Sequence, residues 1–126
     1  MQNRPTAAEL IDAVATFVEK DVMPSLDGAL SFQCRVALNA LRIIGRELDL
    51  TPGLNTEEHS RLVALLGQDA PLDALNRELC QRVRDGAIEI DDPELIAHLK
   101  RTTLGKASVD NPRYSGYREA LKAEAR

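Results

Sequence analysis

The chain has 126 residues, a length that fits one domain with a hydrophobic core of its own. Its 16 lysines and arginines against 20 acidic residues give a net charge of −4, which argues against a broad basic surface for nucleic acid. Aromatic residues make up only 3% of the chain, which argues against stacking platforms for single-stranded nucleic acid, so the core must consist of Leu, Ile, Val and Ala.

The sequence also carries no sign of a membrane or secretory destination. No apolar run approaches the roughly 18 residues that span a bilayer, and the first ten residues lack the basic and apolar regions of a signal peptide. Cys34 and Cys80 form no CxxC motif, and both fall at apolar positions of predicted helices, where cysteine packs as a small hydrophobe. We therefore expect a cytoplasmic protein with no membrane partner.

The first predicted helix begins at Thr6, where Glu9 three residues later completes a capping box. Apolar side chains then recur at helical spacing and form one stripe: Leu10, Ile11, Val14, Phe17 and Val18. The helix is expected to end near residues 21–23, because Pro24 disfavours helical conformation at the residue before it.

Residues 31–50 predict a long helix that is apolar on two faces. One face carries Cys34, Ala37, Leu38, Leu41, Ile44 and Leu48, and the second carries Phe32, Val36, Ala40 and Ile43. A helix of this kind is expected in the middle of a helical domain and not on its surface. Pro52 and Gly53 are expected to break it.

A third helix is predicted from Asn55 or Thr56, with Gly67 suited to the position that follows its C-terminal end. A fourth helix is predicted over residues 71–85, and Gly86 stops it.

An aspartate directly before a proline, Asp92-Pro93, predicts the start of a fifth helix that fades near Ser108. A turn follows, and residues 114–126 predict a last short helix with few apolar side chains. We therefore expect an all-α fold, a single bundle of five to six helices with a long central helix. Residues 1–110 would form the bundle, and residues 111–126 would add a turn and a short or partly disordered helix to the same domain.

The sequence contains few residue patterns that are typical of catalytic or metal-binding sites. The sequence has no GxSxG, HExxH or Walker pattern, and its two histidines are His59 and His98. His98 follows Glu94 by one helical turn, an arrangement that orients a general base but is also an ordinary helix pair. We expect no enzyme, no catalytic residue, no metal site and no cofactor. The enzyme alternative would need His98 with Glu94, or Arg35 with Tyr114, in a cleft.

The polar side of the predicted long helix carries Arg35, Asn39, Arg42 and Arg46, with no acidic residue before Glu47. Half-buried arginines need partners. Those partners are either acids of the same chain, such as Glu9, Asp12, Glu78 or Asp110, or a carboxylate or phosphate ligand that the planar guanidinium binds through two bonds.

A second polar set follows the fifth predicted helix, over residues 109–115. Asn111 before Pro112 predicts a defined turn from which Arg113 and Tyr114 project. The segment either closes the chain back onto the bundle or presents these two side chains to a ligand. The candidate ligand-binding residues are thus Arg35, Asn39, Arg42, Arg46, Arg113 and Tyr114.

Several segments in fixed order carry a resemblance. They are residues 3–14, 17–24, 32–41, 46–48, 75–80 and 110–115, which include FQCRVALNAL, LNRELC and DNPRYS. Together they resemble a small bacterial helical domain family of unknown function, found beside or fused to aminoglycoside-phosphotransferase-like kinases and acyl-CoA dehydrogenases. The resemblance covers most of residues 3–115 and assigns no chemistry to any of them.

The resemblance implies a non-enzymatic accessory or interaction module that acts with such a kinase or dehydrogenase. A module of this kind should expose a contiguous apolar patch. The alternative is a binder of an anionic small molecule, an acyl-CoA or a phosphorylated metabolite, through the arginine ladder. Self-association into a homo-oligomer is compatible with both interpretations.

Overall fold

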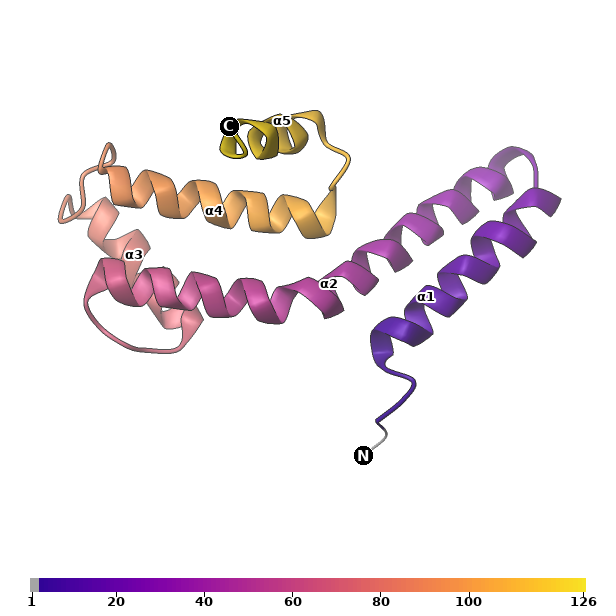
Figure 1. Cartoon of the computed structure of the whole chain (residues 1–126), viewed down its shortest axis with the longest axis horizontal. Helices are drawn as coiled ribbons and strands as arrows, with labels where there is room; N and C mark the ends of the chain where they lie inside the picture. The colour runs from indigo at the N-terminus through magenta and orange to yellow at the C-terminus, as the bar shows by residue number, and fades with distance from the viewer. Residues whose placement is uncertain (1–2) are drawn as a thin grey trace. The chain divides into compact units, whose positions relative to one another are not determined.

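The computed structural model describes residues 3–126, and this part of the chain is helical without a strand. Its α-helices are α1 (Ala7–Phe17), α2 (Gly28–Leu66), α3 (Leu72–Arg84), α4 (Pro93–Asp110) and α5 (Ser115–Glu124) (Figure 1). The predicted all-α class with a long central helix is confirmed.

Tertiary contacts divide the chain into two compact units. The first unit holds the residues up to Thr51 together with Val109–Asn111, and the second holds Pro52–Ser108 and Pro112–Arg126. The boundary between the units within α2 falls at Pro52. The predicted division of the chain at residue 110 stays a prediction.

Helix α1 begins with the predicted capping box. The backbone N–H of Glu9 donates to Thr6 Oγ1 at 3.2 Å, and the Thr6 N–H donates to Glu9 Oε2 at 2.7 Å. The α-helix itself ends at Phe17, earlier than predicted. The chain stays helical, however, through a π-helical turn, Val18–Val22, and a 3-10 turn, Met23–Ser25, that contains Pro24.

The predicted break at Pro52 and Gly53 is wrong, and so is the separate third helix, because α2 runs through both residues. A proline removes one backbone hydrogen bond and crowds the preceding turn at a cost of about 3 kcal/mol, which tertiary contacts can offset. The residues just after Pro52 do pack: a Cβ on Gly105 of α4 would lie 3.2 Å from the Leu54 side chain. The helix ends at Leu66, and Gly67 follows it as predicted, with φ +70° and its N–H bonded to Val63 O at 2.9 Å.

In the first unit α1 lies alongside the N-terminal part of α2 (Figure 1). Ala15 is fully buried in this unit and Leu38 nearly so. The two helices are in contact at Gly45, where an added Cβ would lie at the ordinary contact distance of 3.5 Å from Ile11 Cγ2. Only one side of this part of α2 is therefore covered.

The other apolar face of α2 is open, and the expected central position of residues 31–50 is wrong for this unit. Phe32 is 64% exposed and Val36 is 55% exposed. The reason is that, within the described residues, this unit supplies only the segment up to the turns after α1 and Val109–Asn111 as neighbours.

The second unit has a leucine core where three helices meet. α2 contributes Leu62 and Leu66, α3 contributes Leu75 and Leu79, and α4 contributes Leu95. Leu62 and Leu75 are fully buried. This cluster positions α4 against the C-terminal part of α2 (Figure 1).

The ends of α3 and α4 follow the predicted signals. Gly86 has φ +73° after α3, and Asp92 Oδ1 accepts hydrogen bonds from the N–H groups of Glu94 at 2.8 Å and Leu95 at 3.1 Å. Helix α4 then continues to Asp110, past the predicted end at Ser108.

The last segment is helical over Ser115–Glu124 and lies beside α4, to which a Lys100 Nζ–Glu124 Oε1 ion pair of 3.4 Å connects it (Figure 1). Within residues 3–126 no helix has the length and apolar character needed to cross a membrane. Cys34 is half-buried, but Cys80 is exposed, so its predicted core position is wrong. Helix α3 buries only one face, through Leu75 and Leu79.

Candidate functional site

The arginine ladder is partly engaged within the chain. Arg42 Nη1 contacts Asp12 Oδ1 at 2.8 Å, and Arg42 Nη2 contacts Glu19 Oε2 at 3.0 Å. One guanidinium thus bridges two turns of the neighbouring chain segment. Pairing of Arg42 with Asp12 was one of the predicted internal contacts and is confirmed, whereas the contact with Glu19 was not foreseen.

Arg46 is held differently, because its Nε donates to the backbone carbonyl of Val109 at 2.6 Å. Val109 is buried, and its carbonyl belongs to the C-terminal end of α4, where unpaired carbonyls attract cations. This contact supports the predicted closing role of the segment that begins at Val109. Arg35 and Asn39 are exposed.

A hollow of about 200 Å³ lies beside these residues in the first unit. Arg42 and Arg46 line it together with Asp12 and Asp49, so its two cations face two carboxylates. The charge is balanced, and ligand binding at the ladder stays a prediction.

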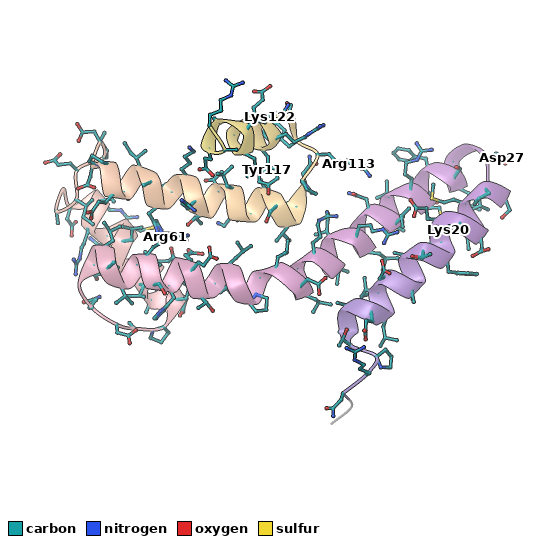
Figure 2. All side chains as sticks on the ribbon, in the orientation of Figure 1. Lys20, Asp27, Arg61, Arg113, Tyr117 and Lys122 are labelled. Atoms are coloured by element: carbon teal, nitrogen blue, oxygen red, sulfur yellow. The ribbon has the colours of Figure 1, made fainter. Side chains whose placement is uncertain are left out.

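Arg113 and Tyr114 belong to the second unit. Both are exposed and lie in the segment between α4 and α5, where Figure 2 labels Arg113. Neither unit alone therefore brings the six predicted ligand-binding residues together.

A second hollow, of about 350 Å³, lies between α2 and α4 in the second unit. Its lining is Arg61, Ala64 and Leu65 from α2, with Glu94, Ala97, His98 and Arg101 from α4. His98 is only 4% exposed and is the one buried polar side chain in residues 3–126.

Two buried polar atoms of this hollow have no hydrogen-bond partner in the described part of the chain: His98 Nδ1 and Arg61 Nε. Arg61 extends from α2 toward α4 (Figure 2), where its Nη2 donates to Thr102 Oγ1 at 3.3 Å. Buried polar groups are nearly always paired, and each unpaired one costs about 1–3 kcal/mol. The two atoms make this hollow the stronger candidate site.

Burial lowers the pKa of His98 below its ordinary value of 6.5. The Arg61 charge lowers that pKa further, while Glu58 opposes the shift. The imidazole is therefore neutral at pH 7. Glu94 lines the same hollow, but His98 Nδ1 has no hydrogen-bond partner within residues 3–126, so Glu94 does not orient the ring through this nitrogen.

Sequence reasoning missed Arg61 and Arg101. Arg101 follows His98 by three residues and Glu94 precedes it by four, so a shared face of α4 could have pointed to it. Arg61 had no such signal, because its position opposite α4 depends on the pairing of two helices distant in the sequence.

Lowering the pH is expected to destabilise the protein through His98. Since the folded pKa is depressed, stability is fully present above pH 6.5 and is lost as the pH falls below it, because the unfolded chain binds a proton that the folded chain does not. The loss is at most about 1.4 kcal/mol per pH unit and levels off below the folded pKa. Urea unfolding at several pH values measures it.

The matched variants for this measurement are His98→Gln and His59→Gln. His59 Nε2 contacts the Ala70 carbonyl at 3.0 Å and Asp69 at 3.1 Å, so it fastens the loop after α2. His98→Gln should flatten the stability profile between pH 7 and 5.5, whereas His59→Gln should keep the decline. An unchanged slope in His98→Gln would contradict the assignment.

Comparisons with known proteins agree with the sequence pattern at the level of the family. A family model described as a domain of unknown function (DUF6285) matches residues 24–114, a range that contains α2, α3 and α4 and both hollow-lining arginines of the second unit. No curated protein and no solved structure matches the chain. Since the family model covers well over half of the sequence, the protein belongs to the family of the domain of unknown function DUF6285.

Proposed function

We propose that this protein is a non-enzymatic interaction module that binds a protein partner through the first unit. The observation that carries the proposal is a set of exposed apolar side chains on one face of α1 and one face of the N-terminal part of α2: Leu10, Val14, Phe17, Phe32 and Val36. We call this set the apolar surface.

The spacing within the apolar surface supports a common interface. Leu10, Val14 and Phe17 follow one another by four and three residues, so they share one face of α1. Phe32 and Val36 are likewise one turn apart on α2. Single exposed apolar residues are common, but a row of them on two neighbouring helices is typical of protein interfaces.

The proposed partner is an aminoglycoside-phosphotransferase-like kinase or an acyl-CoA dehydrogenase encoded beside this protein. This part of the proposal rests on the resemblance of the sequence to a bacterial family that accompanies such enzymes. Proteins that are fused in one organism and separate in another commonly bind each other. The anion-binding alternative has less support, because Arg42 already contacts two carboxylates and Arg46 contacts a backbone carbonyl.

The test mixes the purified chain with each purified enzyme and measures complex formation by calorimetry and light scattering. Phe32→Asp is expected to weaken the complex at least tenfold, since buried aromatic side chains dominate interface energies. The matched control is Ile90→Asp in the second unit, which is 79% exposed and should leave the affinity unchanged.

Several outcomes would count against the proposal. They are no complex with either enzyme, equal weakening by both substitutions, or a homo-oligomer that Phe32→Asp dissociates while neither enzyme binds. Both substituted residues are exposed, so the circular dichroism spectrum and melting temperature should stay unchanged, and a loss of binding then reports the interface.

A further inference from the structure

The hollow between α2 and α4 contains groups that the packing of the second unit does not satisfy. His98 is only 4% exposed, and its Nδ1 has no hydrogen-bond partner in the described residues. Arg61 Nε on the opposite helix is also buried and unpaired. Both residues line one hollow, so a rotation of either side chain toward the hollow brings its unpaired atom to a ligand there.

The charges of the lining indicate what kind of ligand fits. Arg61 and Arg101 are cations, Glu94 is an anion, and His98 is neutral at pH 7 because its burial lowers its pKa. The net charge of the lining is therefore 2 − 1 = +1. A ligand with one negative charge balances it, whereas Glu94 opposes a second negative charge.

The apolar part of the lining adds a second constraint. Ala64, Leu65 and Ala97 bring methyl and isobutyl groups to a space of about 350 Å³. This volume lies near the lower end of the range for small-molecule sites. It suits a short hydrocarbon chain attached to a charged group.

The geometry points to a binding site in this hollow for a small monocarboxylic acid with a short apolar tail. Arg61 Nε–H donates to one carboxylate oxygen, and the Arg101 guanidinium supplies the second positive charge. The tautomer of His98 with its proton on Nδ1 donates to the carboxylate, and the tail lies against Ala64, Leu65 and Ala97. The site is in the second unit and does not depend on the apolar surface of the first.

The test titrates the full chain with sodium butyrate, butyramide and inorganic phosphate, by calorimetry and by the proton resonances of the histidine rings. Butyrate should bind at one site with saturation and shift the His98 resonances. Butyramide has a similar shape without the charge and should bind at least tenfold more weakly. Phosphate should also bind more weakly, because Glu94 opposes its second charge.

A charge-removing variant and a matched control locate the binding. Arg101→Gln should weaken butyrate binding at least tenfold, and since Arg101 is exposed, the fold should persist. Lys106→Gln removes an equal charge from the exposed surface of the same helix outside the hollow and should leave the affinity unchanged. Ala97→Leu should reduce binding by filling the space without changing any charge.

The site would be ruled out by the absence of saturable butyrate binding at millimolar concentration. Equal affinity for butyrate and butyramide, or equal affinity of Arg101→Gln and the parent chain for butyrate, would do the same. Tighter binding of phosphate than of butyrate would overturn the assignment to a monocarboxylate.

Discussion

Leu75→Ala is expected to lower the free energy of unfolding by about 2–5 kcal/mol, the range for buried leucines. Leu75 is fully buried and belongs to the cluster where α2, α3 and α4 meet. Alanine removes the apolar contacts and leaves a cavity that the surrounding leucines fill only in part. Since whole domains are stable by only about 5–15 kcal/mol, one substitution should remove a large share of the stability.

Urea unfolding followed by circular dichroism measures this loss. The matched control is Leu99→Ala on α4, because Leu99 is 49% exposed and should cost less than about 1 kcal/mol. Equal losses in the two variants would contradict the position of the core. A second transition that Leu75→Ala leaves unmoved would show that the first unit unfolds separately.

The helix ends were the most predictable part of the fold, because each depends on residues close in the sequence. Thr6 with Glu9, Asp92 before Pro93, and Gly67 all form the predicted caps. A capping box and a left-handed glycine satisfy the backbone groups of their own turn. Nothing distant in the chain has to be known to place them.

The second apolar face of residues 31–50 shows a limit of hydrophobic periodicity. The pattern indicates which apolar side chains share a face of the helix, but it does not say whether another part of the chain covers that face. Phe32 and Val36 were expected inside the domain and are exposed in the first unit. Under the proposed function, a partner covers them.

One of the two candidate sites was partly predictable from the sequence, and the other was not. Asp12 was among the acids predicted to pair with the arginines of the long helix, and it contacts Arg42. The hollow of Arg61 and His98 depends on how α2 and α4 pair. The incorrect break at Pro52 obscured that pairing, because it separated Arg61 from the long helix.

Pro52→Ala is expected to raise the free energy of unfolding by about 2 kcal/mol. Alanine in a helix interior is about 3 kcal/mol more favourable than proline, and it restores an N–H donor to the ladder of α2, which runs through this position. The gain is reduced by roughly 0.4–1 kcal/mol, because the unfolded chain becomes more flexible. Pro52 is exposed, so its removal leaves no cavity.

Gly53→Ala is the control with which the gain in the free energy of unfolding is compared. Gly53 lies in the same turn, and a Cβ there meets no atom within 4 Å. That substitution should stabilise by about 1 kcal/mol through helix propensity alone. Urea unfolding of both variants separates the two effects. If Pro52→Ala gains no more than Gly53→Ala, the proline does not break a hydrogen bond that alanine can restore. If Pro52→Ala instead destabilises, α2 requires the proline at this position, and the helix-interior account of Pro52 is wrong.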